Sequence, residues 1–551
     1  MCGIYGITAK DPLLATEMMD RCNHRGPDGS DLYYDDHITL AHNLLAITAD
    51  PKHSLQPWRT PQGRVLVYNG EIFNYTDLIQ RYRHQFTPKT TCDTELLAWG
   101  LDAYGIEFVD QIDSQHAFAL WDPQSKELFL SRDHAGIKPL YYAVLPDKIA
   151  FASELRALTP LLPTKELDPL SVSTYAYTGL NVTSHGFLRG THKVMAGETL
   201  RIHNNTIEHH HTDLIQGTED QPFDPLEFVD IMRTATHEQC RGQRDLGVFL
   251  SGGLDSSIVA LHASELHPGI RTFTTRIEPC PPDKEDYNSD ADCAKQLAEL
   301  WHTTHTEVVH TPKHYLEYFE RACGVIEEPL YNPSLPMYMQ ANEAQHLMGT
   351  TVTLAGDMGD ELCYGYPAYQ KIKRMQFNSY RDVIAQWTRR LSKPPQIKPT
   401  MSRDSVVDYL AMTTFKDCGV ASDIGAYMRM DQRGVCAEDY FRRNDRLAMC
   451  YGMEGRFPWA SKRVMHYCMN LDMHTKINGD LKHVVKTAYA DLLPSYITQK
   501  PKTGWTSPLQ QWRQQGTPGV EQIEAQYTGW QGKAWPMGWQ YKLYKSKHGL
   551  G

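Results

Sequence analysis

Long apolar runs, closely paired cysteines and an excess of basic residues are all missing from this 551-residue sequence. No run approaches the roughly 18 apolar residues of a membrane span, and residues 1–7 lack the basic and apolar stretches of a secretory signal. The net charge of −11 argues against nonspecific binding to nucleic acid, which needs a basic surface. There is no internal repeat and no low-complexity tract. We therefore expect a cytoplasmic globular enzyme with small-molecule substrates and no membrane or nucleic-acid partner.

Cysteine and histidine side chains can act as nucleophiles or metal ligands, and among them one residue is a strong candidate for a catalytic nucleophile. The 12 cysteines have no Cys-x-x-Cys pair, and in a reducing compartment such cysteines are mostly buried thiols. Three histidines at 209–211 favour a solvated strand end over a metal site, because adjacent residues do not easily converge on one ion. Cys2 differs, because removal of Met1 would leave an α-amine beside its thiol. An α-amine with a pKa of about 8 can accept the thiol proton, so one residue would supply nucleophile and base.

The pattern of the chain changes at about residue 205. Before it, β-branched or aromatic runs punctuated by Gly, Pro and Asp predict strands at residues 64–68, 117–121, 127–131 and 140–144. After it, amphipathic segments alternate with apolar runs at residues 246–250, 271–275 and 350–354. Such alternation predicts a parallel sheet flanked by helices. The polar stretch 211–225 between the two halves contains Gly217, Pro222 and Pro225 and is typical of an interdomain linker.

Cys2 is followed by a series of motifs that resembles the glutaminase domain of the class II, N-terminal-nucleophile amidotransferases. The motifs are MCGI (1–4), HRGPD (24–28), YNGEIFNY (68–75), CDTE (92–95), FALWD (118–122), RD (132–133), GIKPLYY (136–142) and SE (153–154). The resemblance implies that Cys2 is the nucleophile and that Asn69 and the Gly70 amide form the oxyanion hole, a role for preorganised donors. It also implies that Glu71 and Asp93 hold the ammonium group of glutamine, because carboxylates are acceptors only.

One position departs from that family pattern. After Ala41 and His42 the family normally carries an arginine that binds the α-carboxylate of glutamine, and here Leu44 stands in its place. Losing such a charge-assisted pair costs on the order of 2–5 kcal/mol when the other charge stays buried, or several powers of ten in the glutamine requirement. Arg59 is a candidate substitute. The hypothesis is that free ammonia rivals glutamine as the nitrogen source.

A glycine-rich loop, SGGLDSS at 251–257, directly follows the apolar run 246–250 and precedes a helical pattern at 258–266. Its glycines let the backbone approach phosphate oxygens, to which the hydroxyls and the helix N-terminus can donate. Asp255 can hold Mg²⁺ between phosphates. The loop lacks the Gly-Lys-Ser/Thr ending of a Walker A site. It resembles the loop of the ATP pyrophosphatases, which form an adenylate and release pyrophosphate.

Further motifs, in order along the chain, resemble the asparagine synthetase family. They are EP (328–329), NPS (332–334), LAGDMGDEL (354–362), YGY (364–366), NDRLAM (444–449), EGRFP (454–458) and KPKTGW (500–505). The resemblance implies that Lys502 meets the pyrophosphate, rather than being a solvated loop lysine, and that Asp357 orients or deprotonates the incoming ammonia. It implies ATP contacts at Leu250, Ser251, Gly252, Gly253, Asp255, Ser256, Thr275 and Gly356, and Mg²⁺ at Asp255 and Asp360.

Three positions near this second site also depart from the pattern. Asp357 stands where asparagine makers usually have glutamate, Met358 replaces a glycine, and the segment 459–461 ends in Ser461 instead of aspartate. Relatives that act on other carboxylates often have aspartate at the position of Asp357. We therefore expect these departures to bear on the acceptor pocket or the ammonia path.

We predict an α/β protein with an αββα glutaminase sandwich at residues 1–205, a linker at 206–225 and a helix-flanked parallel-sheet ATP pyrophosphatase domain at 226–551. The predicted reaction makes asparagine from aspartate and ATP through a β-aspartyl-adenylate, with glutamine or ammonia as nitrogen donor. One alternative is the same machinery acting on a peptide, cell-wall or secondary-metabolite carboxylate. A second is a protein with a degenerate glutaminase domain that depends on ammonia or only binds a partner. The sequence leaves open whether the chain forms a homodimer.

Overall fold

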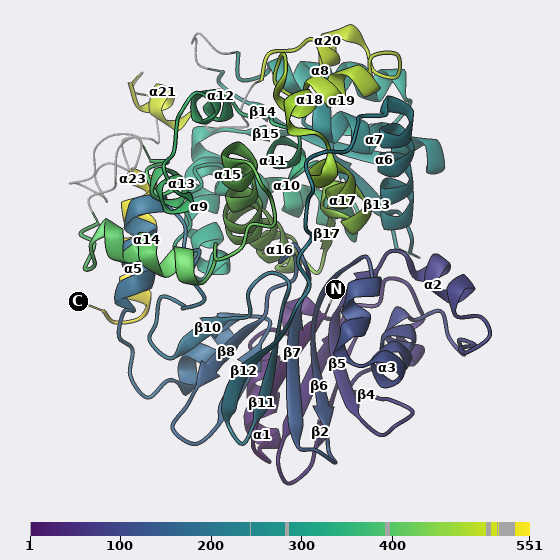
Figure 1. Ribbon diagram of the computed structural model, residues 1–551, viewed down its shortest axis with the longest axis vertical. Helices are drawn as coiled ribbons and strands as arrows, with labels where there is room; N and C mark the ends of the chain where they lie inside the picture. The colour runs from purple at the N-terminus through teal and green to yellow at the C-terminus, as the bar shows by residue number, and fades with distance from the viewer. Residues whose placement is uncertain are drawn as a thin grey trace.

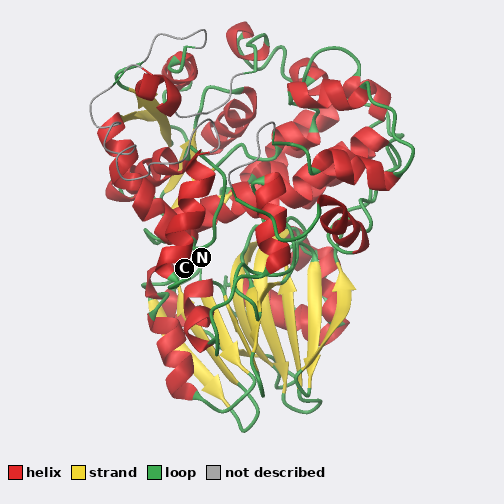
Figure 2. Ribbon diagram, turned by 90° about the vertical axis from the view of Figure 1, so that its left-hand side faces the viewer, coloured by secondary structure: helices red, strands yellow, loops and turns green. Residues whose placement is uncertain are grey.

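The computed structural model has two lobes, an N-terminal lobe of antiparallel sheets and a C-terminal lobe of helices around a parallel sheet (Figure 1, Figure 2). It describes residues 2–242, 244–280, 286–391, 397–502, 508–514, 516 and 535–550. Met1 and residues 503–505, which belong to the motifs above, lie outside the described residues. Within the described ranges, no helix has both the length and the apolar character needed to cross a bilayer.

Two six-stranded sheets face each other in the N-terminal lobe, with strand orders β10-β8-β9-β1-β3-β2 and β12-β11-β7-β6-β5-β4. The first contains β1 (Gly3–Ile7), β2 (Gly29–Tyr34), β3 (Thr39–Leu44), β8 (Tyr141–Val144), β9 (Ile149–Ala152) and β10 (Thr191–Lys193). The second contains β4 (Trp58–Arg59), β5 (Val65–Ile72), β6 (Ser114–Asp122), β7 (Glu127–Arg132), β11 (Glu198–His203) and β12 (Thr206–Thr212). Apolar side chains of both sheets, including Ile4 and Val67, fill the space between them. Figure 2 shows these strands gathered in the lower half of the molecule.

Helices cover the outer faces of both sheets. α1 (Pro12–Asp20) packs on the first sheet, and α2 (Tyr75–Arg81) and α3 (Asp93–Tyr104) pack on the second. The predicted αββα sandwich is therefore confirmed, and so are the strands predicted in this half of the sequence. α4 (Leu155–Leu158) and α5 (Pro169–Thr178) complete the lobe.

The three consecutive histidines lie on β12, the outermost strand of the second sheet, where His209 and His210 are exposed. In the described part of the chain, no group of three or more His, Cys, Asp or Glu side chains is arranged to hold a metal ion. The exposure of His209 and His210 on an outer strand is that of a solvated strand end. β12 occupies residues 206–212 of the segment predicted as a linker, and the chain then runs without regular structure to α6 (Pro225–Gln239). The exact domain boundaries stay a prediction.

The C-terminal lobe is built on a five-stranded sheet with the order β15-β14-β13-β16-β17. Every neighbouring pair in it is parallel, as the alternation of strands and amphipathic segments predicts. Its strands are β13 (Leu246–Phe249), β14 (Arg271–Ile277), β15 (Thr304–His310), β16 (Val352–Leu354) and β17 (Glu454–Arg456). The helix after β13, α7 (Leu254–Leu266), begins four residues earlier than predicted, because the loop turns at its glycines and Gly253 is already the N-cap.

The remaining described helices belong to the C-terminal half of the chain. They are α8 (Ser289–Leu300), α9 (Pro312–Ile326), α10 (Leu335–Leu347), α11 (Gly359–Leu362), α12 (Pro367–Lys373), α13 (Tyr380–Trp387), α14 (Arg403–Met412), α15 (Asp423–Asp431), α16 (Arg442–Met449), α17 (Lys462–Asn470), α18 (Met473–Ile477), α19 (His483–Ala488), α20 (Ser495–Thr498), α21 (Leu509–Gln514) and α23 (Trp535–Lys547). A π-helix, Gln432–Phe441, joins α15 to α16. π-Helical turns frequently mark functional sites, and this one leads into the second cavity described below.

A buried ion network joins the two lobes. Arg25 of the N-terminal lobe lies 2.9 Å from both Glu154 and Asp445, and Arg446 lies 2.9 Å from Glu154. The side chains of these residues are at most 1% exposed. Removing one partner of such a buried pair costs about 3–5 kcal/mol, because it leaves a charge without compensation. The HRGPD and NDRLAM motifs therefore hold the lobes in one arrangement.

Candidate active sites

The first cavity lies in the N-terminal lobe at the start of β1 and holds about 30 Å³, room for roughly two waters. Cys2 lines it and is buried, and its backbone N–H donates to Oδ1 of Asn69 on β5 at 2.9 Å. Gly70 also lines it, and a Cβ there would lie 2.3 Å from the Gln115 carbonyl oxygen, so only glycine fits. Three residues predicted from two separate motifs are thus brought together. Burial raises the pKa of the Cys2 thiol, so the thiol needs a base before it can attack.

Glu71 and Asp93 line the same cavity, as the sequence predicts. Asp93, the first residue of α3, accepts hydrogen bonds from the Tyr68 hydroxyl at 3.1 Å and the Ile72 N–H at 2.9 Å. Burial raises the pKa of both carboxyls, and the charge of Asp93 raises that of Glu71 further. Two buried acceptors of this kind are suited to a cation such as an ammonium group.

A residue of the other lobe completes this wall. Glu454 of β17 lines the cavity and accepts from Gln115 Nε2 at 3.0 Å and from Arg456 Nε at 2.6 Å. Burial works to raise the pKa of Glu454, but the charges of Arg456, the chain N-terminus and Lys138, together with the Arg456 hydrogen bond, outweigh it and bring the pKa to about 2. Arg456 also lies 3.6 Å from Glu71. The sequence placed Glu454 and Arg456 only in a synthetase motif, because no local pattern links them to a cavity of the N-terminal lobe.

Leu44 lies in the cavity wall at 2% exposure, packed against Cys2 and Ala46. The described residues that line the cavity include no lysine or arginine. Arg59, the predicted candidate substitute, is exposed, stacks on the Tyr33 ring at 4.9 Å and is not among the lining residues. The departure at Leu44 therefore leaves the cavity wall itself without a cation.

The second cavity, of about 380 Å³, lies at the carboxyl ends of β13 and β16. In open parallel sheets this is where ligands bind. Eight of the predicted residues line it, namely Ser251, Gly253, Asp255, Ser256, Gly356, Asp357, Asp360 and Lys502. Leu250, Gly252 and Thr275 do not, and Phe249, Phe273 and Thr274 lie there instead.

The glycine-rich loop explains part of this difference. Gly252 has φ +79°, and a Cβ on it would lie 2.0 Å from the Asp290 carbonyl oxygen on α8. It therefore shapes the loop by packing against α8, while its neighbours Ser251 and Gly253 face the cavity. Leu250 is fully buried in the core, and its N–H donates to the Phe273 carbonyl at 2.9 Å.

Two aspartates and two lysines form a charged cluster in this cavity. Lys482 ion-pairs with both Asp255 and Asp360, and Lys502 ion-pairs with Asp360. Burial raises the pKa of the Asp255 carboxyl, whereas for Asp360 the two lysines outweigh burial and lower its pKa. Lys482 was not predicted, because nothing local distinguishes it. The signal that could have suggested it was the charge of the predicted residues, because Asp255 and Asp360 carry two negative charges and Lys502 supplies only one positive charge.

The same aspartates fit a magnesium site. Mg²⁺ is usually held by one or two carboxylates together with substrate phosphates. Asp255 and Asp360 both face the cavity, and Oδ1 of Asp255 is buried with no hydrogen-bond partner in the described part of the chain. The donor set present is therefore suited to a divalent cation that arrives with a nucleotide.

Asp357 belongs to a second charged cluster in the cavity. It lies 3.5 Å from Nη2 of Arg443 and accepts from Nδ2 of Asn444 at 3.3 Å. Arg443 also pairs with Asp439 at 2.8 Å and stacks on the Tyr338 ring at 4.0 Å. Burial raises the pKa of the Asp357 carboxyl, and Arg443 offsets part of this effect. Arg443, like Lys482, is a lining residue that the sequence analysis missed.

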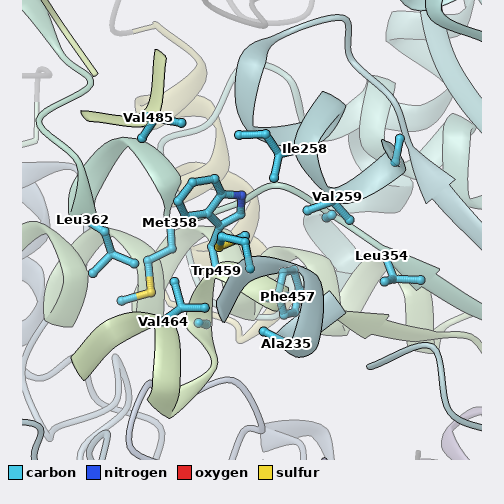
Figure 3. Close-up of a cluster of buried hydrophobic side chains, with 14 of the residues drawn as sticks. Ala235, Ile258, Val259, Leu354, Met358, Leu362, Phe457, Trp459, Val464 and Val485 are labelled. Atoms are coloured by element: carbon cyan, nitrogen blue, oxygen red, sulfur yellow. The ribbon is translucent and has the colours of Figure 1, made fainter. Parts of the chain in front are cut away.

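The other departures from the family pattern fall at different places. Met358 lines the cavity with φ +84° and is 2% exposed, packed in the cluster of Figure 3 with Trp459 and Leu362. A left-handed non-glycine residue is strained by about 1–3 kcal/mol. Ser461 is not a lining residue, and its hydroxyl donates to Asp113 of the N-terminal lobe at 2.6 Å. Met358 thus shapes the cavity, and Ser461 joins the two lobes.

Comparison with known proteins agrees with this two-site arrangement. Residues 1–212 match the model of the glutamine amidotransferase domain, and residues 227–527 match that of asparagine synthase. The chain is 25% identical to asparagine synthetase [glutamine-hydrolyzing] 1 of Bacillus subtilis, over 93% of this chain and 88% of that protein. It is 24% identical to asparagine synthetase B of Escherichia coli, over 91% and 81% of the two chains, and 25% identical to the Mus musculus enzyme, over 92% and 84%. With this match over more than half of its length, the chain belongs to the asparagine synthase family.

Proposed function

We propose that this protein makes asparagine from aspartate and ATP, with glutamine or ammonia as the nitrogen donor, and releases AMP and pyrophosphate. The observation that carries the proposal is the second cavity, where a phosphate-binding type of loop, two aspartates and two lysines meet at the carboxyl ends of parallel strands. Family membership and the names of the relatives support the same reaction.

In the first half-reaction Cys2 attacks the side-chain amide of glutamine. After removal of Met1, its α-amine would take the thiol proton, which is needed because burial raises the pKa of the thiol. The tetrahedral oxyanion would accept hydrogen bonds from the Gly70 N–H and from Nδ2 of Asn69, which has no partner among the described residues. The C–N bond breaks, ammonia leaves, and water then releases glutamate from the thioester.

In the second half-reaction the β-carboxylate of aspartate attacks the α-phosphorus of ATP and pyrophosphate leaves. Lys502 and Lys482 would neutralise the pyrophosphate as its charge grows. Mg²⁺, held by Asp255 and Asp360, would supply further positive charge for the phosphates. Ammonia then attacks the acyl carbon, with Asp357 placed to accept its proton because burial raises the pKa of that carboxyl. The C–O bond to AMP breaks and asparagine forms.

A second candidate function keeps this chemistry and changes the acceptor. Asp357 is one methylene shorter than the usual glutamate and Met358 fills space normally left by a glycine, so the acceptor pocket has its own shape. The acceptor would then be another carboxylate, such as that of a peptide or a secondary metabolite. Leu44, which leaves the cavity wall without a cation, favours a further variant in which ammonia is the working donor.

The deciding experiment is pyrophosphate release from ATP and Mg²⁺ with aspartate, comparing glutamine with ammonium and identifying the product by mass. Asparagine from both donors is the expected result. The Cys2→Ala variant should lose the glutamine-dependent product and keep the ammonium-dependent one, because Cys2 acts only in the first cavity. Asparagine from ammonium alone would mean that the N-terminal lobe has lost its activity. No aspartate-dependent pyrophosphate with either donor would rule out the proposed acceptor.

A further inference from the structure

The first cavity offers acceptors for one end of glutamine and no partner for the other. Glutamine carries an α-ammonium and an α-carboxylate. Glu71, Asp93 and Glu454 line the cavity and suit the ammonium, whereas the described lining residues include no cation for the carboxylate. A buried carboxylate without a cation is costly. If glutamine binds here, a positive side chain must reach the cavity from its rim.

Two arginines act electrostatically on the carboxyl groups of this cavity. Their charges lower the pKa of Glu71, working against the burial that raises it. Arg456 pairs with Glu454 and donates to the carbonyl oxygens of Gln239 and Arg241. Its Nη2 has no hydrogen-bond partner among the described residues but lies 3.6 Å from the Glu71 carboxylate, which already draws its charge. Arg456 is also 0% exposed, so it cannot turn to a new partner without breaking these bonds. Arg241 is the other arginine.

Arg241 is held at the rim of the cavity between two of its walls. Its guanidinium stacks on the Tyr75 ring at 3.9 Å, and Nη2 donates to the carbonyl oxygen of Thr91 at 3.5 Å, one residue before the lining residue Cys92. A Cβ on the next residue, Gly242, would lie 3.1 Å from Ile47, which also lines the cavity.

The free end of Arg241 is available to a ligand. Nη1 is buried and has no hydrogen-bond partner in the part of the chain that the structure describes. A buried guanidinium N–H without an acceptor is costly, and a carboxylate is the acceptor whose geometry it matches best. Stacking on Tyr75 fixes the plane of the guanidinium, so little side-chain entropy would be lost on binding.

We propose that Arg241, a residue of the C-terminal lobe, binds the α-carboxylate of glutamine in the cavity of the N-terminal lobe and thereby makes up for Leu44. This inference rests on the proposed use of glutamine. It makes the glutamine site a shared one, with its nucleophile on one lobe and its carboxylate-binding residue on the other. Because Arg241 follows α6, which packs in the core of the C-terminal lobe, glutamine binding becomes sensitive to how the two lobes are arranged.

The test measures glutamine hydrolysis by the full-length chain as Arg241→Met, which keeps an unbranched apolar side chain but removes the guanidinium over Tyr75, and as Arg241→Lys. Arg241→Met should raise the KM for glutamine about 10- to 100-fold, the range for losing one charge-assisted hydrogen bond, with ammonium-dependent pyrophosphate release within about twofold of wild type. Arg241→Lys should raise the KM less, because the charge is kept. The matched control is Arg59→Met, an arginine on the same lobe as the cavity but outside its lining, which should leave the KM unchanged.

A second readout separates recognition from structural support. Wild type should prefer glutamine to its uncharged α-amide, and Arg241→Met should lose most of this preference, which a structural defect would not do. The double variant Leu44→Arg, Arg241→Met should have a KM for glutamine at least about tenfold lower than that of Arg241→Met alone. An unchanged KM or an unchanged preference in Arg241→Met would overturn the inference, as would a rise in KM for Arg59→Met. Absence of glutamine hydrolysis in wild type would instead overturn the proposed use of glutamine.

Discussion

Replacing Lys482 by methionine tests the charge balance of the second cavity most directly. Lys482 is 5% exposed and ion-pairs with both Asp255 and Asp360. Methionine keeps the length and most of the apolar stem, and both side chains occupy the same left-handed position, φ +58°, so the strain is unchanged. The substitution removes one positive charge from between two buried carboxylates.

The expected cost follows from that geometry. Breaking a buried pair by removing one partner costs about 3–5 kcal/mol, and Coulomb's law gives about 4 kcal/mol for one pair at 4 Å with an effective dielectric constant of 20. At about 2 °C per kcal/mol for a domain of this size, the Tm of Lys482→Met should fall by about 6–10 °C. The thermal unfolding is measured without ATP or Mg²⁺, so that no added cation replaces the lysine.

The loss should also depend on pH. In wild type the lysines hold the pKa of Asp360 below its usual value, so its contribution to stability is present above the unfolded pKa and is lost as the pH falls. Without Lys482, burial and mutual repulsion raise the carboxyl pKa in the folded state. A carboxyl group whose pKa is raised in the folded state contributes to folding stability only at low pH, and this contribution is lost as the pH rises through the raised pKa. The Tm difference from wild type should therefore be larger at pH 8 than at pH 5.

Lys486→Met is the matched control. Lys486 lines the same cavity and has no ion pair within 4 Å among the described residues, so its replacement should change the Tm by less than about 1 °C, the range of ordinary surface substitutions. Equal Tm values for Lys482→Met and wild type at pH 8 would refute the reasoning. So would a Tm difference that does not change with pH.

Three further substitutions test other parts of the same cavity. Met358→Gly relieves about 1–3 kcal/mol of left-handed strain but loses a buried side chain worth about 2–5 kcal/mol, so chemical denaturation should show a net destabilisation of about 1–2 kcal/mol, the difference between the middles of the two ranges. Burial raises the pKa of Glu361 to about 8, so wild type loses stability as the pH rises from the usual glutamate pKa of about 4.5 to about 8, and the Tm gain of Glu361→Gln over wild type should grow steadily from pH 5 to pH 8.5. Asp357→Asn should lower the kcat of ammonium-dependent synthesis by about 10²- to 10⁴-fold, as expected for loss of a general base. The KM for ATP should be nearly unchanged. A small change in kcat would rule out the proposed role of Asp357.

Local sequence determined the elements of the fold with little help from tertiary structure. The alternation of apolar runs and turn residues placed β5 to β8 and β13, β14 and β16 correctly. A strand with one buried face needs alternating apolar residues, and a strand buried on both faces needs a continuous apolar run, so both kinds can be recognised in the sequence. The contiguous motifs around Cys2, Asn69 and Asp255 also came together as predicted. Each of these residues lies on, or next to, the strand or loop that positions it.

Boundaries within those motifs were less predictable. Gly252 belongs to the loop motif, yet it packs on α8 rather than facing the cavity. Thr275 was expected at the cavity, but Thr274 lines it. Successive residues of a strand point to opposite faces, and which face meets the cavity depends on helices that are remote in sequence.

The sequence by itself thus determined the two-part α/β architecture and most of the residues that line the two cavities. Only the tertiary structure decided which distant charges complete the two sites. Glu454 lines the cavity of the N-terminal lobe from the C-terminal lobe, Arg456 lies 3.6 Å from Glu71 in its wall, and Lys482 reaches Asp255 from 227 residues away. The physical reason is that a buried charge must be neutralised by whichever opposite charge the packing brings near, and that partner leaves no pattern in the residues around either one.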